Sequence, residues 1–495
     1  MGPFLWAVAR SALGTTLSRI TGLVRDAAVA YVFGASASYD AFLVALFIPN
    51  ALRQLLGEGG LAAAFLPVYA RAKEHGEGDA LARSTFALLF VVLPPLCLVG
   101  ALLARWYVPI LAAGFPPEKM AQAVNLAQWL FPLIGFVSVA ALSGGILNAH
   151  GRFFLPALAP AALNLSMVVG AVFLSRWLRP PIFGLAAGSL VGGVGMVAIQ
   201  LPFLRGRILG RGPVWPPHPD LGDVGRRLLP VLGGLMVAEV NTLVDNRLAS
   251  YLADGSIAVL QYAMRLFQLP LGVVAASVAA VALPRLAQHV ARGEEQGFRT
   301  ALARGFLVTA ACMLPAMAGL LVLGRPILAV LFQRGAYTAA DTLRTYGALA
   351  GYLAGLWAYA LVYLFSRAFF ALGRPALPVL AGAVALTLNV GLNLWWVRIW
   401  GTFGLALATG IAGWADALLL GIVLWRRHPG WVQWRPVVAV GLASTGMGLS
   451  VAVADRFLVP YGPWVEVAVG TMLGAVLYLG LAWLLGLPRW LRAAR

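Results

Sequence analysis

Residues 18–68 read SRITGLVRDAAVAYVFGASASYDAFLVALFIPNALRQLLGEGGLAAAFLPV, and most of this stretch is apolar enough to cross a membrane as helix. The stretch nevertheless carries six ionisable residues, which are Arg19, Arg25, Asp26, Asp40, Arg53 and Glu58. A charged side chain at the centre of a bilayer costs about 2.5–3.5 kcal/mol on insertion scales. Because such groups normally face a water-filled cavity or a partner, the stretch predicts membrane helices that line a polar path.

The composition of the whole chain is that of a membrane protein. Of the 495 residues, 61% are hydrophobic and 11% are charged, and the mean hydropathy is +0.85. The apolar runs are about 20 residues long, the length that helices need to cross hydrocarbon and too long for membrane β-strands. The net charge of +18 does not indicate nucleic-acid binding, because membrane proteins keep Lys and Arg at cytoplasmic helix ends. We therefore expect an all-α polytopic membrane protein.

Apolar runs bounded by Pro, Gly and charge predict fourteen transmembrane helices. They cover residues 8–32, 39–69, 82–104, 121–147, 157–175, 183–203, 224–251, 257–284, 302–323, 342–371, 377–397, 403–425, 436–455 and 464–487. The longest runs are expected to be tilted or broken. Most loop Lys and Arg residues fall on one side if the N-terminus is inside, so both termini are predicted to be cytoplasmic. The first residues show no cleavable signal peptide.

The chain also contains a weak internal repeat. GRFFLPALA at 151–159 aligns with GRPALPVLA at 373–381, and FLPVYA at 65–70 aligns with ALPRLA at 282–287. Six helices per copy leave both copies in one orientation, as in transporters built from two parallel halves, although small residues and Pro also recur by chance. We predict two pseudo-symmetric six-helix lobes and two added helices, with an N-lobe at 1–204, a cytoplasmic linker at 205–222, a C-lobe at 223–428 and helices 13 and 14 within 429–495.

Arginines inside the predicted spans point to an anionic substrate. They are Arg19, Arg25, Arg53, Arg247 and Arg265. Guanidinium presents a bidentate fork to phosphate, so we predict that Arg25, Arg53 and Arg265 line a cavity and bind an anion, with phosphate as the expected one. The sequence places no acid within a helical turn of Arg265. Arg19 and Asp26, seven residues apart, share a helix face, whereas Arg25 points elsewhere; the alternative is that such charges form ion pairs that fix helix packing.

A second polar cluster is rich in oxygen atoms. It comprises Asp245, Asn389, Asn393 and Thr409, on three predicted helices. Asn389 and Asn393 are four residues apart and share a face, so with one carboxylate they suit a small monovalent cation. Hydrogen bonding of Asn between helices is the other interpretation. Arg247 is a further candidate partner for Asp245.

The opening stretch resembles the signature of the MurJ (MviN) lipid II flippase family, in the order SRITGLVRD, FGAS and DAFLVALFIPNALRQLLGEGGLAAAFLPV. Further matching segments are GGILNAHGRFFLPALAPAALNLSM (144–167), YAMRLFQLPLGV (262–273), LFQRGAYTAADT (331–342) and SRAFFALGRPALPV (366–379). The resemblance follows the chain in order over nearly its whole length. Its opening motif is highly specific.

This resemblance implies the fold of the multidrug/oligosaccharidyl-lipid/polysaccharide exporter superfamily, with helices 13 and 14 forming a groove for a polyprenyl tail. It implies movement of lipid II across a bacterial cytoplasmic membrane. The implied pyrophosphate-binding residues are Arg19, Arg25, Arg53 and Arg265, with Asp26 and Asp40 as acidic neighbours. The implied Na+ ligands are Asp245, Asn389, Asn393, the carbonyl of Leu405 and Thr409. Met264 and Asn393 depart from the family, because acids occur at both positions in relatives.

Three rival functions remain open at this point: a cation-coupled drug exporter, a flippase for another polyprenyl-linked oligosaccharide, and a membrane scaffold of the division machinery. A cavity rich in arginine argues against cationic substrates. The sequence contains no GxxxxGK[ST] loop, serine elbow or HExxH motif, so we expect a transporter and not an enzyme. Expected partners are lipid II, membrane lipids and cell-wall synthesis or division proteins, and no nucleic acid.

Overall fold

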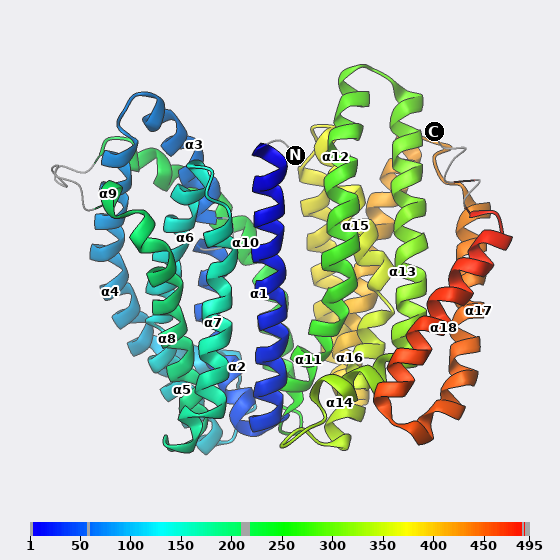
Figure 1. The fold of residues 1–495 in the computed structure, drawn as a ribbon, viewed down its shortest axis with the longest axis horizontal. Helices are drawn as coiled ribbons and strands as arrows, with labels where there is room; N and C mark the ends of the chain where they lie inside the picture. Colours follow the sequence, from blue (N-terminus) through cyan, green and yellow to red (C-terminus); the bar gives the residue numbers. More distant parts are fainter. Residues whose placement is uncertain (1–2, 57–59, 209–217, 488–489, 491–495) are drawn as a thin grey trace. The chain divides into compact units, whose positions relative to one another are not determined.

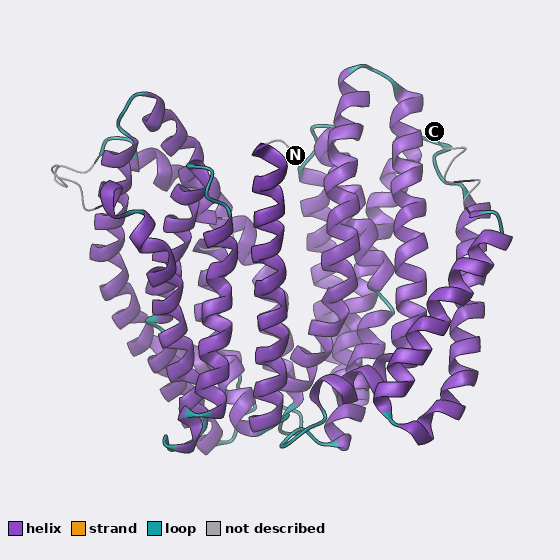
Figure 2. Ribbon diagram, in the orientation of Figure 1, coloured by secondary structure: helices purple, strands orange, loops and turns teal. Residues whose placement is uncertain are grey.

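The computed structural model describes residues 3–56, 60–208, 218–487 and 490. Every regular element within these ranges is a helix, as Figure 2 shows. The all-α prediction is therefore confirmed for the described chain. Glu58 lies outside the described residues, and although Arg53 lies on a described helix, its side chain does not belong to the described part.

The described residues of the first half form ten α-helices, followed along Figure 1 from blue to green. They are α1 (Pro3–Phe33), α2 (Ala37–Leu56), α3 (Gly60–Glu74), α4 (Gly78–Leu111), α5 (Pro117–Leu130), α6 (Leu133–Ala149), α7 (Phe154–Val172), α8 (Ile182–Gln200), α9 (Arg205–Ile208) and α10 (Leu221–Ala249). The predicted run 39–69 is thus divided between α2 and α3.

In the second half, the part of the chain that the structure describes forms eight α-helices. They are α11 (Ser256–Pro270), α12 (Ala276–Ala291), α13 (Glu295–Phe332), α14 (Ala339–Leu353), α15 (Leu356–Ala371), α16 (Ala376–Arg427), α17 (Trp434–Leu458) and α18 (Pro463–Leu484). The 52-residue α16 changes direction at Gly401, whose φ of 55° and ψ of −129° are not helical. Glycine tolerates positive φ, so this break falls between the predicted helices 377–397 and 403–425.

Nine helical segments of the described chain are long and apolar enough to cross a membrane, or ten if the bent pair α14 and α15 is one span. This confirms a multi-pass membrane protein. Helix α1 is not among the nine, and it carries several charged residues. The charges that suggest a polar path thus also lower the hydropathy of the helices that bear them.

Packing divides the chain into two compact units. Unit 1 comprises residues 1–258 and 335–337, and unit 2 comprises residues 259–334 and 338–495. In unit 1, one core cluster includes Phe65, Tyr69 and Phe86. In unit 2, another includes Phe298, Phe306 and Phe365. The division into lobes at residues 204 and 223 stays a prediction.

Helices α7 and α8 of unit 1 lie against each other through glycines. A Cβ added to Gly170 would lie 2.5 Å from the carbonyl oxygen of Gly184, and one added to Gly188 would lie 2.5 Å from the carbonyl oxygen of Ser166. Small residues let membrane helices approach this closely. These backbone contacts fix the rotation of α7 about its own axis relative to α8. Helix α7 in turn lies beside α1, as Figure 1 shows.

We expect Gly188→Ala to lower the free energy of unfolding by about 1–3 kcal/mol, because the added methyl group would press on backbone atoms. Gly441→Ala on α17 is the matched control, since nothing lies within 4 Å of its Cβ position. That change is expected to be neutral or slightly stabilising. Thermal unfolding in detergent measures both effects. Equal unfolding temperatures for the two variants would contradict the close packing of α7 on α8.

Candidate functional site

Arg25 on α1 is held by two side chains of unit 1. Its Nε and Nη2 atoms donate to Oδ1 of Asp26 at 2.9 and 2.6 Å, and its Nη1 atom donates to Oδ1 of Asn164 at 2.9 Å. The side chains of Arg25 and Asp26 are 16% and 10% exposed. A carboxylate and an amide thus fix the guanidinium plane in a largely buried setting, which is the arrangement needed to present a fork to an anion.

Helical spacing places Asp26 on one helix face with Arg19, and in the structure the adjacent Arg25 binds Asp26. Arg25 precedes Asp26 directly, and its long side chain turns back to reach the carboxylate. Arg19 is exposed and forms no ion pair among the described residues. Neighbouring side chains of an α-helix project about 100° apart around the helix axis. The Arg25 side chain has enough rotatable bonds to bridge this angle, so it can form an ion pair with the residue that follows it.

Asn164 on α7 is a site residue that the sequence did not single out. Its Nδ2 atom donates to the carbonyl oxygen of Ser18 at 3.1 Å and to Oγ1 of Thr21 at 3.3 Å. The residue is only 7% exposed. Asn164 therefore joins α7 to α1 and orients Arg25 at the same time. A lone Asn in an apolar helix gives no sequence signal for this role, apart from its place in the 144–167 segment.

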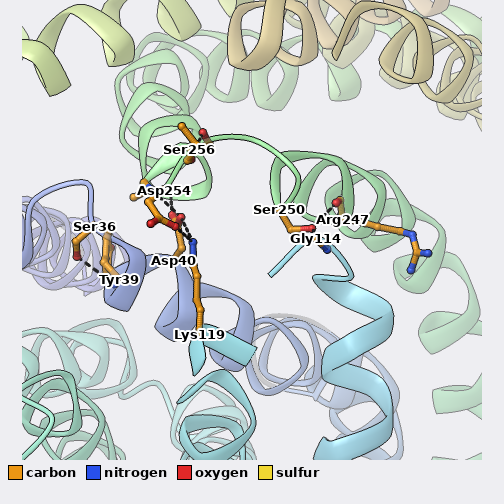
Figure 3. A network of polar contacts seen from close by, with 12 residues as sticks. Ser36, Tyr39, Asp40, Gly114, Lys119, Arg247, Ser250, Asp254 and Ser256 are labelled. Carbon is orange, nitrogen blue, oxygen red and sulfur yellow. Dashed lines mark hydrogen bonds and ion pairs between the residues drawn. The ribbon is translucent and has the colours of Figure 1, made fainter. Parts of the chain in front are cut away.

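Asp40 at the start of α2 lies in a different network, shown in Figure 3. Lys119 on α5 donates to Oδ2 of Asp40 at 2.9 Å and to Oδ1 of Asp254 at 2.8 Å. The backbone N–H groups of Gly255 and Ala258 donate to the two oxygens of Asp40 at 2.7 and 2.9 Å. Asp40 is 1% exposed and Lys119 is 8% exposed. Asp40 thus accepts hydrogen bonds at the N-terminus of α11, where the helix dipole favours a negative charge.

The end of α10 is attached to α4 and the loop after it. Arg247 donates through Nη1 to the carbonyl oxygen of Ile110 at 2.5 Å, and the backbone N–H of Gly114 donates to Oγ of Ser250 at 3.0 Å. Figure 3 shows Arg247 and Ser250 on one helix end. The cation binds a carbonyl in the last turn of α4, where the helix dipole is negative. Asp245 also takes part in a polar or electrostatic interaction.

The oxygen-rich residues of unit 2 form a hydrogen-bonded chain inside α16. Asn393 donates to Oδ1 of Asn389 at 2.7 Å, Asn389 donates to Oγ1 of Thr409 at 3.2 Å, and Thr409 donates to the carbonyl of Leu405 at 3.1 Å. All four residues are buried. The oxygen atoms of these residues have lone pairs that the hydrogen bonds leave unused, so their chemistry suits a small hard cation. Asp245 belongs to unit 1, and its place in one site with them stays a prediction.

Arg265 lies on α11 in unit 2 and is exposed. Arg265 nevertheless takes part in a polar or electrostatic interaction, although the sequence places no acid within a helical turn of it. Its approach to Arg25 stays a prediction, as does the role of Arg53.

A multi-pass helical protein with a largely buried, hydrogen-bonded arginine and carboxylate on its first helix has the features of a membrane transporter. Two solved structures share the fold. A lipid II flippase MurJ in an inward closed conformation is 28% identical, with 95% of this chain and 97% of that chain covered and a TM-score of 0.82. An inward-facing multidrug resistance MATE family transporter of the MOP superfamily is 17% identical, with 86% and 98% covered and a TM-score of 0.70.

Sequence comparisons identify the family. The family model described as lipid II flippase MurJ matches residues 29–478. The probable lipid II flippase MurJ of Vibrio cholerae is 35% identical over 82% of this chain and 80% of its own length. The lipid II flippase MurJ of Burkholderia cenocepacia is 31% identical over 95% of both chains. The chain therefore belongs to the MurJ lipid II flippase family, and the resemblance read from its motifs is confirmed.

Proposed function

We propose that this protein moves lipid II from the inner to the outer leaflet of the bacterial cytoplasmic membrane by alternating access. The family match over most of the chain and the similarity to a solved MurJ structure support this proposal. The observation that carries it at the level of chemistry is the guanidinium of Arg25, held by Asp26 and Asn164 inside a membrane helix. A pyrophosphate is the part of lipid II that such a fork recognises.

The proposal includes an arrangement of fourteen membrane-spanning helices with both termini in the cytoplasm. Two lobes, at residues 1–204 and 223–428, would rock about a central cavity, and the last two helices would hold the lipid tail. The break of α16 at Gly401 and the divided run α2–α3 support counting more spans than apolar length alone gives. Cell-wall synthesis or division proteins are the partners that this role would need.

Arg25 would exchange partners during transport. Two N–H donors of Arg25, on Nε and Nη2, point to the single oxygen Oδ1 of Asp26, so an oxygen of an arriving pyrophosphate can replace Asp26 on the same two donors. When the headgroup leaves, Asp26 can return and restore the ion pair. Arg53, Arg265 and Arg19 would add positive charge to the cavity. The carboxylate of Asp26 thereby keeps Arg25 oriented while the cavity is empty.

A transport assay tests the function directly. Lipid II is incorporated into liposomes with the purified full-length protein, and an enzyme that modifies the headgroup is added outside. The headgroup fraction that becomes accessible with time is expected to rise well above that in protein-free liposomes. A lipid-linked oligosaccharide without the muropeptide serves as the second substrate. Equal rates with and without the protein would overturn the proposal.

We expect Asn164→Ala to slow lipid II transport and to lower the free energy of unfolding by about 1–3 kcal/mol, because buried hydrogen-bonding groups on α1 lose their partner. Asn164→Asp distinguishes the two roles of this residue. It keeps an acceptor for Arg25 but loses the N–H donor to Ser18 and Thr21. The Asp variant should therefore retain more transport than the Ala variant at comparable stability loss. Equal transport by both variants would argue against a positioning role.

A Na+ site at Asp245, Asn389, Asn393, Leu405 and Thr409 remains part of the proposal. When bound, Na+ would supply a positive charge that responds to its gradient. We expect Asn393→Asp, which adds a carboxylate to the cluster, to increase the stabilisation given by Na+ over K+. A ligand at 100 times its Kd stabilises by about 2.7 kcal/mol. Unfolding temperatures in the two salts measure this, and the absence of any Na+-specific shift in both proteins would contradict the site.

A further inference from the structure

Asp416 on α16 is a membrane-helix carboxyl group that has no part in the site described above. It is the only acidic residue between Ala376 and Arg427. The next basic residue along the helix is Arg426, ten residues on, or about 15 Å at 1.5 Å per residue. No cation of its own helix can therefore neutralise Asp416 by local spacing.

Asp416 also has no polar partner from other helices of the described chain. Its Oδ1 atom is buried and accepts no hydrogen bond from the described residues. Helices α14 and α15 pack against α16. Their titratable and charged residues are Asp341, Arg344, Tyr346 and Tyr352 on α14, and Tyr359, Tyr363 and Arg367 on α15.

The two arginines among these residues have other contacts. Arg344 lies 4.0 Å from Asp341, and the guanidinium of Arg367 lies 5.6 Å from the centre of the Phe370 ring. The hydroxyl group of Tyr359 donates to the carbonyl oxygen of Thr409 at 3.3 Å. An ionised carboxylate without a cation or donors is costly in a medium of low dielectric constant, and such a group takes up a proton instead.

The position of Asp416 on α16 places its carboxyl group on the same helix face as other polar side chains. Asp416 is seven residues beyond Thr409, which is two helical turns, so both lie on one face of α16. Thr409 continues this face through its hydrogen bond to Asn389, and Asn389 is bonded to Asn393. We call Asn393, Asn389, Thr409 and Asp416 the polar strip. The strip places one titratable group at the end of a row of neutral hydrogen-bonding groups.

We propose that Asp416 is a proton-binding site and that proton exchange at its carboxyl group is coupled to transport. The step is the gain of one proton from water by the carboxylate and its later release to water, with no other bond made or broken. Asp416 is partly exposed, so its carboxyl group is not fully enclosed by the described chain. The coupling rests on the proposed transport function and adds a proton to the ions that take part in it.

Labelling with dicyclohexylcarbodiimide tests proton binding without any transport assay, because this reagent modifies protonated carboxyl groups in apolar surroundings. The full-length protein in liposomes is treated at acidic and alkaline pH, and the modified peptides are measured by mass spectrometry. We expect at least tenfold more label on Asp416 at the acidic pH, little label on the exposed Asp79 at either pH, and none at position 416 in Asp416→Asn. Label on Asp416 that does not exceed that on Asp79 would overturn the proposal.

Transport under an imposed pH gradient tests the coupling. Wild type and the control Glu466→Gln, which removes a carboxyl group of α18 outside the strip, should change their lipid II transport rate with the gradient. Asp416→Asn should lose this response, and a full response in this variant would overturn the coupling. Asp416→Glu keeps a carboxyl group, so it should keep both the carbodiimide label and the change of transport rate with the pH gradient. This variant replaces Asp416→Asn in the test if the Asn variant does not fold. Labelled wild type that moves no lipid II would overturn the transport function and leave the proton site standing.

Discussion

Replacing Arg25 with alanine is expected to abolish lipid II transport in liposomes and growth of a flippase-depleted strain. A hydrogen bond to a charged group contributes about 1.5–3 kcal/mol, so loss of a bidentate contact to pyrophosphate costs about 100-fold or more in rate. Arg25→Lys should also fail, because an ammonium cannot hold the positions of Asp26 and Asn164 while presenting a planar fork. The corresponding alanine variants of Arg53 and Arg265 are expected to fail as well.

A stability control separates transport from folding. Arg25→Ala leaves the carboxylate of Asp26 largely buried without this partner, so the single variant is also expected to be less stable. The double variant Arg25→Ala, Asp26→Asn removes that charge and should regain stability without regaining transport. Arg105→Ala is the matched control for loss of a membrane arginine, since Arg105 is exposed and lies over the Trp106 ring. Normal growth with all three cavity arginines replaced singly would defeat the proposed role.

Replacing Lys119 with methionine is expected to have the largest effect on stability in unit 1. Breaking a buried ion pair by removing one partner typically costs about 3–5 kcal/mol, because the other charge stays buried. Asp40, at 1% exposure, would keep its two backbone donors, Gly255 and Ala258, but would lose its cation. Titration with a denaturing detergent measures the change in the free energy of unfolding.

A double-mutant cycle assigns the effect to the pair. Asp40→Asn combined with Lys119→Met removes both charges and should be less destabilised than the sum of the single variants. Asp254→Asn is the matched control, since the Asp254 side chain is 64% exposed and pairs with the same lysine. An exposed ion pair contributes only about 0–1 kcal/mol. A Lys119→Met protein as stable as Asp254→Asn would show that the buried pair does not hold α2, α5 and the start of α11 together.

The sequence predicted those features that follow from local composition and spacing. Apolar length predicted membrane helices, the glycine at position 401 fell where the structure breaks α16, and ordered motifs predicted the family. The cost of charge in hydrocarbon selected Arg25 and Asp26, which the structure joins. These inferences depend on neighbouring residues along the chain, so a linear sequence is sufficient for them.

Only the tertiary structure decided the partners of the charges. Asn164 reaches Arg25 across 139 positions of sequence, and Lys119 reaches Asp40 across 79. Which residues meet at such distances depends on how far each helix is rotated and shifted against its neighbour. In unit 1 that rotation is fixed by backbone contacts at glycines such as Gly188, which hydrophobic periodicity does not encode. Sequence therefore determined that buried charges exist in these helices, and helix packing determined what each one binds.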